Sequence, residues 1–261
     1  MAPRGERNDT ATERDRYERR ARDLLERASS KDAPMLAPEL ANVLSAPYRE
    51  YARAVTRVLR PGAAVLELGA GTGMHSGVLC AAGVDTTLTD ISPSALKVLR
   101  RRLDVSRVPA RTFVTPMEST PFADSTFDLV ASAGSLSYAD PSALDGEIAR
   151  VLKPGGSFVC VDSLNHNPVY RLNRWVHWRI RGDRTRSTLL RMPTVARMEA
   201  LGSRFHRWSL HGFGAWSWLW APLSRVVGDV AAARCNDACD KVPGSRRMAF
   251  KFVFEAHGLR K

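Results

Sequence analysis

The sequence of 261 residues lacks an uncharged apolar run long enough to cross a membrane. Its most apolar stretch, residues 215–234, is interrupted by Arg225 and Asp229, whereas a spanning helix needs about 20 predominantly apolar residues. The first 16 residues are charged and lack the apolar stretch of a secretory signal, which is roughly 7–15 residues long. We therefore expect a cytoplasmic protein without a membrane span.

Cysteine is also scarce, with four residues in the chain. Cys235 and Cys239 are four positions apart, but no second Cys/His pair accompanies them, so the pattern of a zinc site is incomplete. Cys80 and Cys160 lie in apolar runs, which is typical of small core residues. We expect reduced, structural thiols and no metal centre.

Acidic residues are few in the last third of the chain. Residues 164–261 contain 18 basic and 6 acidic residues, whereas residues 61–163 contain 8 and 11. The formal net charge of +12 therefore lies in the last third. A run of charge is usually a solvated face, and the alternative is an anion-binding surface, because guanidinium groups suit phosphates and carboxylates.

Strand-like and helix-like patterns alternate through the middle of the chain. Such alternation implies right-handed βαβ units and a parallel sheet. The strands are expected at the start of AAVLELGAG (63–71) and at 85–90, 110–116, 127–134 and 157–163. The helices are expected at 13–27, 48–60, 74–82, 92–103 and 141–152, and a last edge or antiparallel strand is expected at 246–258.

A glycine-rich turn follows the first of these strands. Gly69, Gly71 and Gly73 let the backbone approach a ligand closely, and a following helix would offer free N–H groups. A dinucleotide-binding loop would place its third glycine where Met74 stands, and a phosphate loop of the GxxxxGK[ST] type is absent. Asp90 ends the next strand, where a carboxylate can accept both hydroxyls of a ribose.

Four segments carry a family resemblance. VLELGAGTG (65–73), LTDIS (88–92), TPFADSTFDLV (120–130) and EIARVLKPGGSFVCVDS (147–163) resemble the successive motifs of class I S-adenosylmethionine-dependent methyltransferases. They are most similar to the ubiquinone-synthesis-like small-molecule group, type 11. The resemblance implies an α/β fold with a doubly wound, mostly parallel seven-stranded sheet, flanked by N-terminal helices and a C-terminal inserted cap.

The resemblance also implies S-adenosylmethionine as cofactor and assigns residues to it. Glu67 would orient the methionine region, Asp90 would bind the ribose, and the backbone of Met117 would hydrogen-bond the adenine. Relatives commonly have an aspartate in the place of Pro116, and Glu118 is its nearest replacement. The remaining cofactor contacts would come from Gly69, Ala70, Gly71, Gly73, Ile91 and Ser132.

The expected organisation has five parts. They are a disordered tail (1–16), N-terminal helices (17–60), a cofactor-binding core (61–163), a basic, Trp-rich acceptor cap (164–245) inserted before the last strand, and that strand with its tail (246–261).

An oxygen acceptor must lose a proton, commonly to a His or a carboxylate. His166 directly follows the fifth strand and is the candidate general base, with a structural or surface role as the alternative. His75, on the glycine loop, is a more natural packing or cofactor contact. The candidate residues for binding an anionic acceptor are Tyr138, Arg174, Arg179, Arg181 and Arg184.

The sequence therefore predicts O-methylation of a small anionic metabolite, sugar- or nucleotide-containing, in bacterial specialised or polysaccharide metabolism. A nucleic-acid methyltransferase is one alternative, although Ala133–Leu136 replaces its N/D-P-P-Y/F motif and no Pro-Cys nucleophile is present. Another is a protein of this fold that binds the cofactor without methyl transfer, or catalyses a different reaction. The Trp-, Leu- and Arg-rich cap leaves a weak membrane-surface contact as a further alternative.

Overall fold

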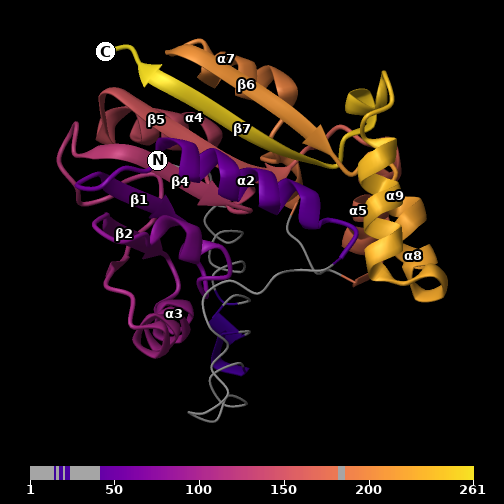
Figure 1. The fold of residues 1–261 in the computed structure, drawn as a ribbon, viewed down its shortest axis with the longest axis horizontal. Coiled ribbons are helices and arrows are strands. Elements are labelled where there is room, and N and C mark those ends of the chain that lie inside the picture. The colour runs from indigo at the N-terminus through magenta and orange to yellow at the C-terminus, as the bar shows by residue number, and fades with distance from the viewer. Residues whose placement is uncertain (1–14, 16–17, 20, 24–41, 182–185) are drawn as a thin grey trace.

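In the computed structural model, which describes residues 15, 18–19, 21–23, 42–181 and 186–261, seven strands form one sheet in the order β3-β2-β1-β4-β5-β7-β6 (Figure 1). The first five strands are parallel, and β7 is antiparallel to both β5 and β6. This is the predicted doubly wound sheet. The strands are β1 (Ala64–Leu68), β2 (Asp85–Asp90), β3 (Arg111–Val114), β4 (Phe127–Ala133), β5 (Leu152–Ser163), β6 (Phe205–Phe213) and β7 (Lys251–Leu259).

Helices cover both faces of the sheet because the strands are apolar on both sides. On β1, Val65 packs in one cluster with the helix α2 (Ser45–Val58), whereas Leu66 packs in another with α4 (Pro141–Val151) and α7 (Val195–Gly202). Figure 1 shows α2 on one face of the sheet and α4 and α7 on the other. The helix α3 (Pro93–Ser106) packs beside β2 and β3.

Two helices begin as the sequence predicts. The Ser92 hydroxyl accepts a hydrogen bond from Ala95 N at 3.1 Å, and Pro93 is the first residue of α3. The Asp140 carboxylate caps α4 in the same way, 2.9 Å from Ala143 N, ahead of Pro141. Each cap satisfies an N–H group that has no partner within its helix, and proline suits the first position because it lacks that group.

The cap differs from its expected boundaries. The helices α5 (Pro168–Arg181), α6 (Arg186–Leu190), α8 (Ser217–Val227) and α9 (Asp229–Cys239) fall within residues 164–245, and η3 (Ser245–Met248) follows. The same stretch also contains β6, which pairs with β7 from Phe205↔Leu259 to Phe213↔Lys251. Residues 164–245 therefore also supply part of the sheet, because their strand β6 forms its edge and β7 lies between β5 and β6.

Residues 74–82 are not the predicted helix. One short turn of 3₁₀ helix, η1 (Ser76–Leu79), stands there instead. The Thr86 hydroxyl bonds to the Leu79 carbonyl oxygen, and Cys80 N bonds back to Gly77 O, so a longer helix does not continue. A second such turn, η2 (Leu136–Tyr138), follows β4.

Most of the expected tail, residues 1–16, lies outside the described residues, apart from Asp15. Within the described part of the chain, no helix is both long enough and apolar enough to span a membrane.

Candidate functional site

A cavity of about 1090 Å³ opens where the parallel strands end. It is lined from the glycine loop after β1, the ends of β2 and β5, the loops after β3 and β4, and the start of β7. This is the edge at which open α/β sheets bind ligands, because the loops diverge on either side of the strand where the order reverses. The volume exceeds the roughly 300–1,000 Å³ of common single-ligand pockets, so it can hold two small ligands together.

The glycine loop forms one wall of the cavity. Gly69, Gly71 and Gly73 all have positive φ, at 70°, 56° and 82°. A Cβ on Gly69 would lie 2.5 Å from Ser135 Cβ, so the loop can approach the end of β4 only without a side chain. At Gly71 the space above the Cα is open, with Asp90 Oδ2 4.0 Å from a hypothetical Cβ. The backbone here can therefore be approached closely by a ligand.

Asp90 lies at the end of β2, beside that loop. Its Oδ2 accepts a hydrogen bond from Gly71 N and its Oδ1 accepts one from Ser92 N, both at 2.8 Å. Burial raises the pKa of Asp90, and these backbone N–H groups oppose the rise. Each oxygen keeps a second lone pair, so the carboxylate is held in place while it can still accept hydroxyl hydrogen bonds.

Glu67 lines the cavity from β1, although its side chain is almost completely buried. The Ser76 hydroxyl donates to its Oε2 at 2.5 Å. Burial raises the pKa of Glu67 to about 7, and the nearby Asp90 carboxylate adds to the rise. A carboxyl group that titrates near neutrality beside a ligand cavity is typical of functional sites.

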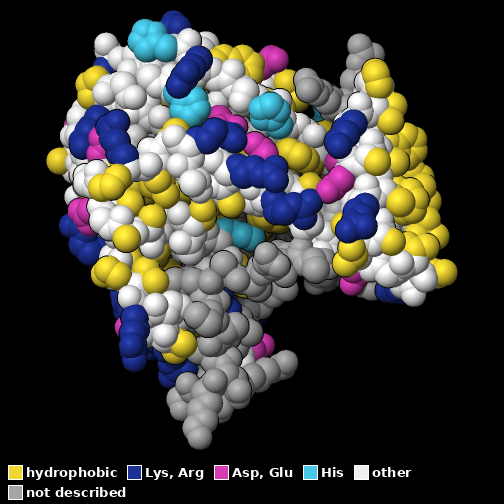
Figure 2. Space-filling model, in the orientation of Figure 1, with side chains coloured by type: hydrophobic (Ala, Val, Ile, Leu, Met, Phe, Trp, Pro, Cys, Tyr) yellow, Lys and Arg dark blue, Asp and Glu magenta, His cyan; other side chains and the backbone are white. Residues whose placement is uncertain are grey.

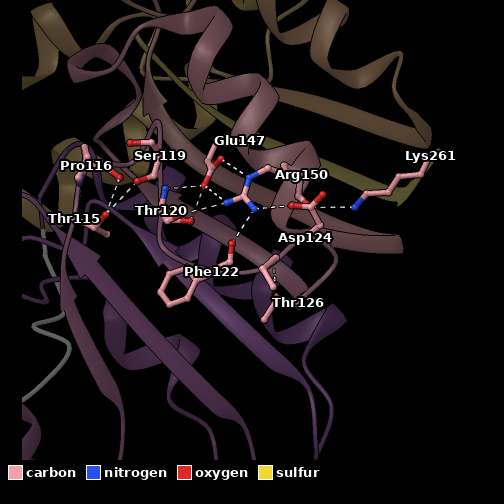
Figure 3. A network of polar contacts seen from close by, with 11 residues as sticks. Thr115, Pro116, Ser119, Thr120, Phe122, Asp124, Thr126, Glu147, Arg150 and Lys261 are labelled. Atoms are coloured by element: carbon pink, nitrogen blue, oxygen red, sulfur yellow. Dashed lines mark hydrogen bonds and ion pairs between the residues drawn. The ribbon is translucent and has the colours of Figure 1, made fainter.

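The loop after β3 carries Met117 and Glu118 into the cavity. A polar network fixes its far end (Figure 3): Glu147 Oε1 accepts from both Thr120 N and Thr120 Oγ1, and Arg150 donates to Glu147 and Asp124. Arg150 also donates to the carbonyl oxygens at 120 and 122. Because Arg150 belongs to α4, the network ties this loop to the helix that packs on the sheet.

An N-terminal segment adds to the wall, since Ala21 and Asp23 line the cavity. Glu18 anchors this segment at the start of α3, accepting hydrogen bonds from the hydroxyls of Ser92 and Ser94. The predicted helix over 13–27 is helical at each of its described positions.

The other end of the cavity contains two aromatic rings and a cation. Tyr48 and His75 stack with their ring centres 4.2 Å apart. The ammonium group of Lys251 lies 5.0 Å from the centre of the Tyr48 ring and 3.5 Å from Ser163 Oγ. Burial, together with the charge of Lys251, lowers the pKa of His75 to about 4, so His75 is neutral near pH 7.

Asp162 also faces this end of the cavity. Its two oxygens accept from Leu136 N at 2.8 Å and Ser163 N at 2.6 Å. Burial raises the pKa of Asp162, while the nearby Lys251 lowers it. Arg191, just beyond α6, adds a second positive charge to the wall, and Thr188 and Met192 line the cavity beside it in sequence.

The structure brings most of the predicted cofactor residues together. Gly73 belongs to the glycine loop and Ser132 to the end of β4, but neither lines the cavity; Ser132 is buried, with its hydroxyl 2.6 Å from that of Ser135. The predicted residues that do line the cavity are Glu67, Gly69, Ala70, Gly71, Asp90, Ile91, Met117, Glu118 and Tyr138.

The predicted catalytic and anion-binding residues are placed differently. His166 is exposed and does not line the cavity, so the geometry does not support its role as general base. Arg174 is buried, donates to Leu164 O at 3.2 Å and stacks over Phe250, also away from the cavity wall. The side chains of Arg179 and Arg181, and the whole of Arg184, lie outside the described residues.

Sequence reasoning missed Tyr48, Arg191 and Lys251. A signal existed for Lys251, because the first residue of a strand antiparallel to β5 must lie at the carboxyl end of β5. The register confirms this, since Lys251 pairs with Ser163. Tyr48 belongs to no motif that could have identified it, whereas Arg191 is the last of the closely spaced arginines from Arg171 onward, a run of charge that the sequence offers as an anion-binding surface.

The chain is similar to known methyltransferases in sequence and in fold. Residues 66–160 match the methyltransferase-domain family. The chain is 35% identical over 124 residues to an uncharacterized methyltransferase of Synechocystis sp., covering 46% of this chain and 53% of that protein. It is 38% identical over 104 residues to a demethylmenaquinone methyltransferase of Renibacterium salmoninarum, covering 39% and 42%. The chain thus spans about half the length of these curated relatives.

Among solved structures, the fold is similar to geranyl diphosphate C-methyltransferase of Streptomyces coelicolor, crystallised with Mg²⁺, geranyl diphosphate and S-adenosyl-L-homocysteine. The TM-score is 0.55 at 17% identity, covering 81% of this chain and 79% of that one. S-adenosylmethionine is the cofactor of this family, and the glycine loop and Asp90 are suited to holding it. Residues 66–160 thus match the methyltransferase-domain family, within a sheet whose strand order and glycine loop are those of class I S-adenosylmethionine-dependent methyltransferases.

Proposed function

We propose that the chain transfers a methyl group from S-adenosylmethionine to an oxygen atom of a small anionic metabolite. The observation that carries this proposal is the position of Lys251. Its ammonium group lies beside Ser163 and Tyr48 at the start of β7, four strands along the sheet from β2, which carries Asp90, and an acceptor would bind there.

The cofactor end follows from the loop geometry. Asp90 would accept the ribose hydroxyls, and the adenine would lie between Ile91 and the loop that carries Met117. Glu67 would face the methionine part, where its raised pKa lets it either donate or accept a hydrogen bond near neutral pH. When bound, the cofactor supplies a methyl group on a positively charged sulfur.

The acceptor end favours an ionised oxygen. A positive charge near a hydroxyl or carboxyl group stabilises its anionic form and lowers its pKa. The Asp162 carboxylate near Lys251 is engaged by two backbone N–H groups, and no carboxylate of the described residues forms an ion pair with the ammonium. Lys251 is therefore available to hold an anion, and the positive charge of Arg191 in the same cavity wall would also attract it.

This revises the site of anion binding while keeping the substrate class. Of the sequence-based candidates, Tyr138 lines the cavity and Arg174 packs inside the cap, whereas the side chains of Arg179, Arg181 and Arg184 lie outside the described residues. Lys251 and Arg191 take the place of Arg174 in the proposal because both line the cavity. The size of the cavity supports a cofactor and a small acceptor side by side.

The test is a methyl-transfer assay with radiolabelled cofactor and paired acceptors. Each pair would contain a carboxylated or phosphorylated metabolite and its neutral amide, ester or dephosphorylated form. We expect turnover of anionic members, with a Michaelis constant raised about tenfold, or about 1.4 kcal/mol, in Lys251→Met. Lys97→Met, on the exposed side of α3, is the matched control and should match the unmodified protein.

Equal turnover of neutral and anionic members would exclude the anionic acceptor. Unchanged kinetics in Lys251→Met would remove Lys251 from the acceptor site. Substrate affinity should also fall as salt is added, because screening weakens the attraction of exposed charges.

A further inference from the structure

The helix α8 is apolar, yet it is almost entirely exposed. Its sequence, SWLWAPLSRVV, contains one charged residue, and within it Ser217 is the residue that is buried. Val226 is 84% exposed and Val227 is 47% exposed. Helices on the surface of soluble proteins normally turn their apolar face inward.

The orientation of α8 is the reverse of that rule. At 3.6 residues per turn, Trp218, Pro222 and Val226 lie along one side, with Leu219 and Leu223 beside them. All five of these positions are exposed. The polar residues Ser217 and Ser224 lie on the opposite side, toward the protein, where the Ser217 hydroxyl is bonded to Gly214 O and Tyr170.

The neighbouring residues extend this surface. Trp216, just before α8, is 42% exposed and lies 6.2 Å from Trp218 between ring centres, and Val230 on α9 is 59% exposed. Figure 2 shows hydrophobic side chains gathered along this edge of the molecule, over α8 and α9. We call the exposed apolar residues from Trp216 to Val230 the α8–α9 ridge.

Positive charges flank the ridge. Arg225, Arg234 and Lys241 are exposed, and in the described part of the chain none of them forms an ion pair with a carboxylate. Of the nearby acidic residues, Asp229 is exposed at the start of α9, whereas Asp237 and Asp240 are occupied elsewhere. Asp237 pairs with Arg49 at 2.8 Å, and Asp240 accepts from Gly214 N and Ala215 N.

We propose that the α8–α9 ridge docks into the surface of an anionic lipid membrane. Indole rings favour the boundary between headgroups and acyl chains, because they combine an apolar body with one N–H donor. Helices that lie in this boundary carry Trp and Leu on one face with Arg or Lys beside it. Trp216, Trp218, Arg225 and Arg234 fulfil this pattern, and the basic groups would face anionic headgroups.

A second copy of the chain is a poorer occupant. In a two-fold symmetric pair, each patch contacts the same patch on its partner, so Arg225 and Arg234 of both copies would be brought together.

The experiment is flotation of the full chain with two kinds of vesicle. One is phosphatidylcholine alone, and the other contains about one third phosphatidylglycerol to supply negative charge. We expect binding to the anionic vesicles at least tenfold tighter than to the neutral ones, falling with added salt. The double variant Trp218→Ser/Val226→Ser should bind the anionic vesicles at least tenfold more weakly than the unmodified protein.

Two matched controls separate the ridge from general surface effects. Val105→Ser/Val114→Ser removes two exposed valines from α3 and β3, and it should float like the unmodified protein. Arg225→Gln/Arg234→Gln should lose the preference for anionic lipid, whereas Lys97→Gln/Arg101→Gln on α3 should keep it. Binding of S-adenosylhomocysteine should be unchanged in all of these variants, because none of the residues lines the cavity.

Two results would overturn the proposal. The first is an unmodified protein that fails to float with anionic vesicles, or a Trp218→Ser/Val226→Ser variant that floats equally well. The second is a dimer, measured by light scattering without lipid, that Trp218→Ser/Val226→Ser dissociates; the ridge would then bind a second copy. Neither result depends on which acceptor is methylated.

Discussion

The segment from β1 to β5 and the segment after β5 contribute to the same cavity in different ways. In the first, ligand-facing groups sit at strand ends and are held by bonds close in sequence, as Asp90 is held by Ser92 N. In the second, the contributing residues come from α6 and from the start of β7, which lie about 60 residues apart. The first arrangement is suited to the cofactor, and the second places the proposed acceptor site on a separate part of the chain.

Charge separates the two segments as well. Residues 61–163 carry 8 basic and 11 acidic residues, and residues 164–261 carry 18 and 6. The acidic groups of the first segment are largely engaged in structure, as Glu147 and Asp128 are. In the second segment several cations stay exposed near an apolar ridge or face the cavity. If the first segment binds the cofactor and the second binds the acceptor and the membrane, substitutions in the first segment should alter cofactor binding alone.

The largest effect is expected from Gly71→Arg. The side chain would enter the cavity directly above the loop, so the affinity for S-adenosylhomocysteine should fall about 100-fold or more, roughly 2.7 kcal/mol. Gly62→Arg is the matched control: its φ is +80°, so it bears a similar backbone strain, but its surroundings are open and it does not line the cavity. Calorimetry should show normal binding in the control; equal loss in both variants would indicate a folding defect.

Because Glu67, in the first segment, has a raised pKa, we expect the stability of the protein to depend on pH. Its pKa is about 7 in the folded protein against 4.5 as the ordinary value. The folded state therefore holds its proton more tightly, and the corresponding stability is present below pH 4.5 and is lost as pH rises toward 7. Glu67→Gln removes this dependence. From about pH 5 to pH 8, the free energy of unfolding of the variant should therefore rise by roughly 2–3 kcal/mol relative to that of the unmodified protein. Urea unfolding of both proteins at pH 5 and pH 8 measures this difference. An equal change in the free energy of unfolding for the two proteins would contradict the burial assigned to this carboxyl group.

A smaller change in binding is expected at Asp90. Asp90→Asn keeps one oxygen but loses the charge, so the affinity for S-adenosylhomocysteine should fall about tenfold, or 1.4 kcal/mol. Asp85→Asn changes the same residue type at the other end of β2, where the side chain is exposed and outside the cavity. If the two variants bound the ligand equally well, the ribose contact would have to be assigned elsewhere.

The smallest effect is expected at Glu118, which lines the cavity and accepts a hydrogen bond from Asp140 N at 3.2 Å. If the backbone at Met117 provides the main adenine contact, Glu118→Gln should weaken binding by less than about threefold, under 1 kcal/mol. A loss of more than about 2 kcal/mol would show that Glu118 makes a charge-assisted hydrogen bond in place of the aspartate missing at Pro116.

Much of the first segment could be predicted from sequence because its determinants are local. A capping serine followed by proline marks the start of α3, and the carboxylate at the end of β2 follows from one strand and one turn. The predicted helix over 74–82 was wrong for an equally local reason. Gly77 lies inside the stretch and Gly73 and Gly83 flank it, and glycine is a poor helix former, so one turn of 3₁₀ helix forms there.

The second segment could be predicted less well because its pairing is distant in sequence. The strand β6 has a weak pattern of its own and becomes a strand by pairing with β7, whose first residue lies 38 positions beyond Phe213. The sequence of α8 predicts an apolar helix face but not its direction, and the usual rule turns that face inward. In the structure, the exposure of Val226 and Trp218 shows that this apolar face turns outward.

Hydrogen–deuterium exchange with and without S-adenosylhomocysteine tests the central claim most directly, namely that the cofactor binds in the glycine-loop cavity. The amides of 66–75 and 115–118 should exchange more slowly with ligand, because the ligand restricts the local opening that exchange requires. The amides of 215–240, which belong to the ridge and not to the cavity, should exchange at the same rate. Protection of 215–240 without protection of 66–75 would contradict the account.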